Sequence, residues 1–163
     1  MGLYMTLQDL LTLKNPLYRL AMSITHNSQE AEDVVQDVII KLWQKSQRDA
    51  MDEVPTSLAY KMTRNLAIDR ARLKDNNTEN IDGMDFSAAS GTEQSIERQE
   101  RIDLIRKAML CLPEKQRSIM QLRDFEEKSY KDIADILEIS EDQVRVSLHR
   151  ARKAVKEKLC PLT

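Results

Sequence analysis

The strongest constraint in this sequence is a pair of amphipathic segments near its C-terminal end. Residues 129–137 and 141–159 both carry apolar side chains at helical spacing, and three residues separate them. Ser140 and Gln143 form the capping-box pattern that starts a helix, so the second segment has a defined beginning. Two helices joined by so short a break predict a helix-turn-helix.

The second of these segments has two chemically opposite faces. On a helical wheel its apolar side chains share one side, and these are Val144, Leu148, Ala151, Val155 and Leu159. The exposed side and its flanks are predicted to carry Arg145, Val146, His149, Arg150, Arg152, Lys153 and Lys156. Six Lys or Arg and one acid between residues 145 and 158 give the basic strip expected of a helix that lies against nucleic acid.

The turn contains one unusual residue. Four residues after the small Ala134, such motifs usually have a glycine, because the turn often needs a left-handed backbone. This chain has Glu138 there. A left-handed Glu138 would cost about 1–2 kcal/mol, unless the turn is built differently.

Composition predicts an all-α protein. Glycine is scarce, helix-forming residues are abundant, and no alternating strand pattern is found. No apolar run is long enough to cross a bilayer, and no export signal precedes the first helix, so we expect a cytoplasmic protein without membrane insertion. Cys111, Cys160 and the two histidines lack metal-ligand spacing, and we expect neither a metal nor a cofactor.

Charge divides the chain into three parts. Residues 76–100 carry six acids and one base, whereas residues 101–163 carry eleven acids and fourteen bases. The net charge of −2 therefore hides a local basic surface. We expect two small helical domains, 1–75 and 98–163, joined by a flexible acidic linker at 76–97.

The N-terminal part is predicted to form helices at residues 3–13, 16–25, 28–47 and 55–74. Asn15 is expected to cap the second helix, which would begin at Pro16. The third helix has a continuous apolar face, which Asp33, Gln36 and Asp37 do not share. The fourth is expected to bury Leu58, Met62, Leu66 and Leu73.

Two segments of the N-terminal part and one of the C-terminal part resemble a known family. AEDVVQDVIIKLW (31–43) and YKMTRNLAIDRARLK (60–74) are similar to region 2 of bacterial sigma factors. Residues 112–155, from LPEKQR to ARKAV, are similar to region 4. Two such regions joined by a short linker are the layout of the extracytoplasmic-function (ECF) group. The resemblance covers nearly the whole chain, apart from the first dozen residues and the linker.

For the N-terminal part, the resemblance implies contacts with polymerase and with the minus-10 promoter element. Residues matching the polymerase contact are Asp33, Gln36, Asp37 and Trp43, and acids on an exposed helix suit a basic partner. Residues matching the part that binds minus-10 DNA and holds separated strands are Tyr60, Arg64, Asn65, Arg70 and Arg72. Many relatives have a Trp-Leu pair where this chain has Ala59-Tyr60, so Tyr60 is either a core residue or a base-stacking ring.

For the C-terminal part, the resemblance implies that residues 141–159 enter the major groove of the minus-35 element. Arg145, Val146, His149 and Arg150 would reach bases, and Val146 suits a thymine methyl group. Arg152, Lys153 and Lys156 would contact phosphates. The expected partners are core RNA polymerase, promoter DNA and an anti-sigma factor.

Three other functional classes are weighed against this hypothesis. A dimeric DNA-binding regulator would share the C-terminal helices but would not need residues 31–43. An enzyme is disfavoured, because the sequence has no Gly-rich phosphate loop, metal cluster or nucleophile-base pair. A helical adaptor without DNA contact would have no reason for the basic strip of residues 145–156.

Overall fold

The structure is a computed structural model that describes residues 4–5, 7–49, 53–75 and 93–159. Its elements, in chain order, are β1 (Tyr4–Met5), α1 (Leu7–Thr12), α2 (Lys14–Thr25), α3 (Ser28–Arg48), β2 (Val54–Pro55), α4 (Thr56–Asp75), α5 (Glu93–Met109), α6 (Glu114–Met120), η1 (Gln121–Phe125), α7 (Tyr130–Leu137) and α8 (Glu141–Leu159). The two short strands pair antiparallel, with Tyr4 opposite Pro55 and Met5 opposite Val54. The expectation of an all-α fold is confirmed.

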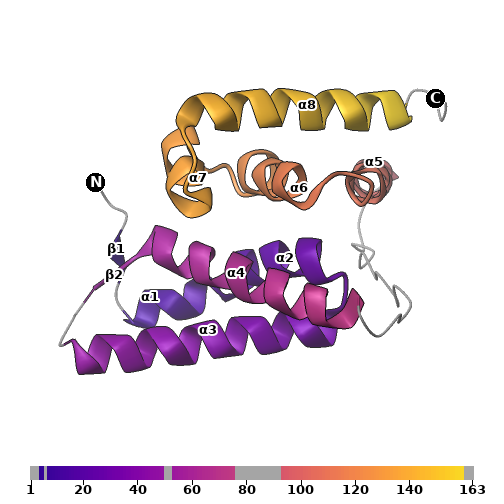
Figure 1. Cartoon of the computed structure of the whole chain (residues 1–163). Coiled ribbons are helices and arrows are strands. Elements are labelled where there is room, and N and C mark those ends of the chain that lie inside the picture. Colours follow the sequence, from indigo (N-terminus) through magenta and orange to yellow (C-terminus); the bar gives the residue numbers. More distant parts are fainter. Residues whose placement is uncertain (1–3, 6, 50–52, 76–92, 160–163) are drawn as a thin grey trace.

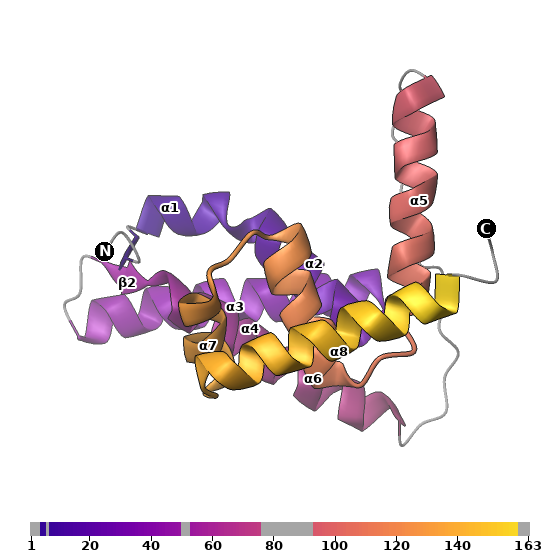
Figure 2. The same ribbon diagram turned by 90° about the horizontal axis from the view of Figure 1, so that it is seen from above.

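Helices α1 to α4 form one layer and α5 to α8 form a second layer over it (Figure 1). We call them the N-terminal half (residues 4–75) and the C-terminal half (residues 93–159). Figure 2 shows that α5 projects away from the other helices, whereas α8 lies across the top of the molecule. Most of the predicted linker lies outside the described residues. Its last five residues, 93–97, belong instead to the first turns of α5.

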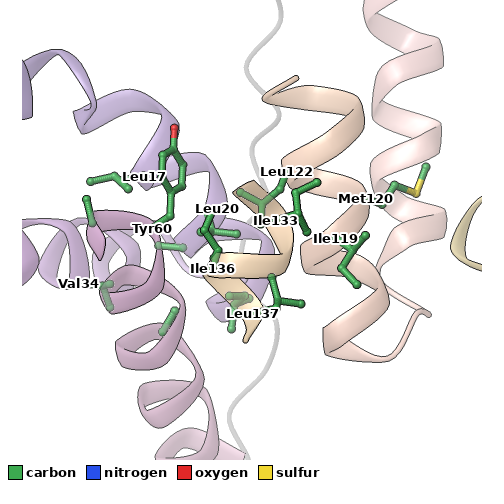
Figure 3. Packing of buried hydrophobic residues seen from close by; sticks show 14 of the residues in the cluster. Leu17, Leu20, Val34, Tyr60, Ile119, Met120, Leu122, Ile133, Ile136 and Leu137 are labelled. Atoms are coloured by element: carbon green, nitrogen blue, oxygen red, sulfur yellow. The ribbon is translucent and has the colours of Figure 1, made fainter. Parts of the chain in front are cut away.

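The apolar faces of the two halves meet in one continuous core. Helix α4 packs against α7, and α2 packs against α6 and η1. Figure 3 shows Leu20 of α2, Ile136 of α7 and Ile119 of α6 in the same cluster of buried side chains. All three side chains are almost completely buried. The structure therefore shows the two halves closed on one another; that each folds alone stays a prediction.

The predicted start of the second helix is wrong. Helix α2 begins at Lys14, and Leu13 occupies the N-cap position without a side-chain cap. The backbone of Leu13 is right-handed helical, and its N–H donates to the carbonyl oxygen of Asp9 over 3.3 Å. The chain thus passes from α1 into α2 with little interruption. Pro16 falls in the first turn, where a missing N–H leaves no intrahelical bond unmade.

The predicted core face of the fourth helix is wrong at Leu73 and incomplete elsewhere. Leu73 is 67% exposed, whereas Leu58, Met62 and Leu66 are partly buried and pack against the core. The fully buried positions of α4 are instead Ala59, Tyr60, Thr63 and Ala67. Three of these side chains are small, which lets α4 approach α2 and α3 closely. The Thr63 hydroxyl donates to the carbonyl oxygen of Ala59 over 2.8 Å, so its burial leaves no polar atom unpaired.

His26 ends helix α2 in a left-handed conformation, with φ 56° and ψ 27°. Its Nδ1 is buried without a hydrogen-bond partner among the described residues. Burial, reinforced by the nearby Arg117 guanidinium, lowers the pKa of His26 to about 4. The folded protein therefore holds this imidazole neutral at pH values where the unfolded chain protonates it.

We expect this burial to make stability depend on pH. Because the pKa of His26 is lower in the folded state, its contribution is complete above pH 6.5 and is lost as the pH falls toward 4. The free energy of unfolding should fall by about 1 kcal/mol through this residue between pH 7 and 5.5. Urea unfolding at both pH values measures the change. The His26→Asn variant, whose side chain also tolerates a left-handed backbone, should lack this contribution; an equal pH dependence would contradict the assignment.

Candidate nucleic-acid interfaces

The helix-turn-helix is built by reciprocal side-chain caps. The Gln143 N–H donates to Ser140 Oγ and the Ser140 N–H donates to Gln143 Oε1, each over 3.1 Å. The Ser129 hydroxyl oxygen accepts from the Asp132 N–H and caps α7. These bonds fix where α7 and α8 begin and confirm the predicted capping box at Ser140. Glu138 between the helices has φ 58° and ψ 46°, the left-handed backbone that the sequence pattern requires.

Helix α8 confirms the two faces that the sequence predicts. Val144, Leu148, Ala151 and Val155 are buried, and Leu159 is partly buried. The predicted DNA-facing residues are all exposed: Arg145, Val146, His149, Arg150, Arg152, Lys153 and Lys156. The exposed face of α8 therefore presents its cations, together with the apolar Val146, to solvent. This is a surface that suits the edges and phosphates of duplex DNA.

The cations of this face differ in their partners. Arg152 is ion-paired with Asp124 of η1, and Arg145 donates to Asp142 over 2.9 Å. The Arg145 guanidinium also lies 5.3 Å from the centre of the Tyr130 ring. Arg150, by contrast, has no ion pair within the described part of the chain. Its guanidinium is therefore available to a ligand, whereas those of Arg145 and Arg152 form ion pairs with neighbouring side chains.

The exposed face of α3 has a different character. Gln36, Ile40 and Trp43 are exposed along one side of the helix, whose opposite side is core, and Trp43 is 52% exposed. Sequence reasoning had included Gln36 and Trp43 but missed Ile40. The helical wheel could have found it, since Ile40 is four residues after Gln36 and three before Trp43. We call these three residues the α3 face.

Asp33 and Asp37 are not free acids, contrary to the sequence-based expectation. Arg70 of α4 lies 2.8 Å from the Asp37 carboxylate and 3.7 Å from Asp33, and it also donates to Glu30. Hydrogen bonds to Glu30 and Asp37 raise the pKa of Arg70 against the opposing effect of desolvation, which is the largest single influence. Arg70 thus joins α4 to α3. Reversing the charges of Asp33 and Asp37 would disturb this contact between α3 and α4 as well as any polymerase contact.

Three of the predicted minus-10 residues on α4 line a cleft where the two halves meet, whereas Arg70 contacts α3. Arg64, Asn65 and Arg72 line a cleft of about 830 Å³. Its other lining residues come from α2, the α2–α3 turn, α4 and α6, and include His26, Glu114 and Arg117. Asn65 and Arg72 are exposed, whereas Arg64 forms a bidentate ion pair with Glu114 of α6 at 3.0 and 2.8 Å. These three residues of α4 therefore share one cleft with Glu114 and Arg117 of α6.

Tyr60 is a core residue in this conformation. Its side chain is 1% exposed, burial raises its pKa, and the Lys128 ammonium lies 4.5 Å from the centre of its ring. Of the two roles that the sequence left open, only the core role fits the closed arrangement. A role in base stacking would require the halves to separate.

Within the described residues, no group of three or more His, Cys, Asp or Glu side chains is placed to hold a metal ion. Nor does any helix in the described ranges combine the length and apolar character that a membrane crossing needs.

Each half of the chain matches a known protein family profile. Residues 10–76 match the family profile described as Sigma-70 region 2, and residues 102–155 match Sigma-70, region 4. The chain is 29% identical to the RNA polymerase sigma-H factor of Pseudomonas aeruginosa, over 94% of this chain and 86% of that protein. It is 27% identical to the ECF RNA polymerase sigma factor SigW of Bacillus subtilis, over 90% of this chain and 84% of that protein.

A solved structure shares the arrangement of the whole chain. It is the sigma factor RpoE in complex with the anti-sigma factor NepR from Bartonella quintana, with a TM-score of 0.72 and 25% identity, covering 93% of this chain and 94% of that one. Regions 2 and 4, in this order and at this spacing, define the class of bacterial RNA polymerase sigma factors. The chain belongs to this family, in its extracytoplasmic-function group.

Proposed function

We propose that this protein binds core RNA polymerase, directs it to a set of promoters and helps to separate the DNA strands there. The observation that carries the proposal is the pairing of a two-faced helix α8 with a region 2 half that presents the α3 face. One half alone would fit a DNA-binding regulator or an adaptor. Both halves together fit a protein that connects an enzyme to DNA, without chemistry of its own.

Each surface has a role in this proposal. The α3 face, flanked by Asp33 and Asp37, offers an apolar centre with acids beside it, which suits a partner helix with basic edges. The exposed face of α8 reads the minus-35 element. Arg64, Asn65, Arg70 and Arg72 hold the minus-10 strands, and Tyr60 joins them once it is uncovered. The site of action is the cytoplasm, where polymerase and DNA are found.

The closed arrangement is too short for both promoter elements. Elements at minus 10 and minus 35 lie about 25 base pairs apart, or about 85 Å along the duplex at 3.4 Å per pair. A compact chain of 163 residues has a radius of gyration of about 15 Å, hence a diameter near 40 Å. Simultaneous contact with both elements therefore requires the halves to separate.

An anti-sigma factor is a further proposed partner. The solved structure with the same arrangement, RpoE, was determined with the anti-sigma factor NepR.

Reconstituted transcription tests the proposed function. Purified core polymerase, which lacks a sigma factor, should produce promoter-specific transcripts from a genomic fragment library only when this protein is added. A matched reaction containing the isolated chain without core enzyme provides the background. Transcripts that are independent of the protein, together with no binding to core enzyme, would contradict the proposal.

A further inference from the structure

Among the residues that the structure describes, three ion pairs join the two halves, and all three have the same polarity. Arg19, Lys61 and Arg64 come from the N-terminal half, and their partners Glu126, Glu138 and Glu114 come from the C-terminal half. The cations lie on α2 and α4, facing η1, α7 and α6. We call these three cations the junction strip. Three carboxylates of the C-terminal half thus cover three cations of the N-terminal half, although Arg117 and Lys128 of the C-terminal half also lie at the junction.

The Arg19–Glu126 and Arg64–Glu114 pairs are partly enclosed, whereas the Glu138 side chain of the third pair is 73% exposed. Arg19 Nε donates to Glu126 over 2.5 Å, and the Glu126 side chain is only 4% exposed. The hydrogen bond to Glu126 is the main reason that the pKa of Arg19 is raised. The Arg64–Glu114 pair is bidentate, a geometry that an arginine makes equally with a carboxylate or a phosphate. The three carboxylates are therefore placed where phosphate groups could bind.

Glu138 gives independent support for this interpretation. It occupies the left-handed turn position between α7 and α8, which glycine would adopt at lower cost. Its carboxylate lies 3.2 Å from the Lys61 ammonium across the junction. For the helix-turn-helix alone, glutamate is an unfavourable residue at this turn position. Its ion pair with Lys61 of the N-terminal half gives Glu138 a function there.

We propose that the junction strip is a binding surface for the phosphate backbone of single-stranded nucleic acid, and that Glu114, Glu126 and Glu138 occupy it in the closed protein. Nucleic acid and the C-terminal half then compete for one surface. The closed form binds strands weakly, and opening exposes the strip and Tyr60 beside Asn65 and Arg72, which are already exposed. This inference rests on the proposed function only in giving the bound strand a role at promoters.

The fraction of open molecules determines how much the apparent affinity for a single strand should change. If the open form is a minor species, the apparent affinity for a strand is reduced by the fraction of open molecules. Weakening two of the three ion pairs should shift that fraction, and we expect a rise of about tenfold in apparent affinity. Glu126 is left in place because its side chain is almost fully buried.

The test compares Glu114→Gln/Glu138→Gln with Glu97→Gln/Glu100→Gln in the full-length chain. Glu97 and Glu100 are exposed on α5, so the control removes the same charge from the same half away from the junction. The probe is a fluorescein-labelled twelve-nucleotide oligothymidylate, followed by anisotropy without polymerase. We expect about tenfold tighter binding for the junction variant and unchanged binding for the control. Equal affinities of the two variants would overturn the proposal.

A second comparison tests the strip itself. In the Glu114→Gln/Glu138→Gln background, Lys61→Gln should reduce the salt dependence of oligothymidylate binding by about 0.7 in log–log slope, the value for one phosphate contact on a single strand. Lys41→Gln, an exposed cation of α3, serves as control and should leave the slope unchanged. Equal slopes for the two variants would show that phosphates bind elsewhere. Because polymerase is absent, these results stand apart from the transcription test of the proposed function.

Discussion

Replacing Trp43 by alanine is expected to weaken binding to core RNA polymerase by about 3 kcal/mol, or about a hundredfold. Trp43 and Ile40 are both 52% exposed on the α3 face, with Gln36 beside them. Large apolar side chains surrounded by polar ones carry most of the energy of protein interfaces. The fold should be unaffected, since an exposed side chain makes few internal contacts. Fluorescence titration of the purified variant with core enzyme measures the loss.

Leu11→Ala is the matched control for Trp43→Ala. Leu11 lies on α1 of the same half and is also largely exposed, so its removal deletes apolar surface away from the α3 face. The free energy of unfolding of each variant should lie within about 0.5 kcal/mol of that of the natural protein. If Trp43→Ala binds polymerase as tightly as Leu11→Ala does, the α3 face is not the interface. This comparison is cleaner than charge reversal at Asp33 and Asp37, which would also break the ion pairs with Arg70.

Replacing Arg150 by alanine should cost about 1–3 kcal/mol on the correct promoter and relax preference at one base position. Arg150 lies at the middle of α8 and has no ion pair within the described residues. Its guanidinium can therefore bond a guanine edge with two hydrogen bonds. Transcription from a library of promoters that differ at each minus-35 position measures both the loss and the altered preference.

Lys153→Ala is the comparison for Arg150. Lys153 is also exposed on α8, about one turn further on, where a helix that enters the groove by its first half has begun to leave the bases. Its loss should weaken all promoters alike and lower the salt slope of duplex binding by about 0.9. If both variants reduce every promoter by the same factor, Arg150 is a phosphate contact, and another residue of α8 determines specificity.

The local structure of the helix-turn-helix could be predicted from sequence because its determinants are close in the chain. The caps at Ser129 and Ser140 join residues three apart, and the faces of α8 follow from its helical period. The same holds for the Asn27 cap of α3, whose side chain accepts from the Glu30 N–H. Such interactions need no knowledge of the rest of the fold.

The core face of α4 could not be predicted in the same way. The sequence analysis placed the large apolar residues of α4 on its buried face, whereas the structure completely buries Ala59, Thr63 and Ala67. Which side of a helix is covered depends on how near its neighbours approach. Small residues are selected where the backbones come close, and that distance is a property of the packed molecule.

The sequence by itself determined the helical elements, the basic face of α8 and the resemblance to regions 2 and 4. Only the tertiary structure decided which charged residues are free. Arg19 and Glu126 are 107 residues apart in sequence, and Arg64 and Glu114 are 50 apart, yet each pair is in direct contact. A helical period or a cap relates residues within one or two turns. An ion pair between halves depends on how two preformed surfaces meet, and no local pattern encodes that geometry.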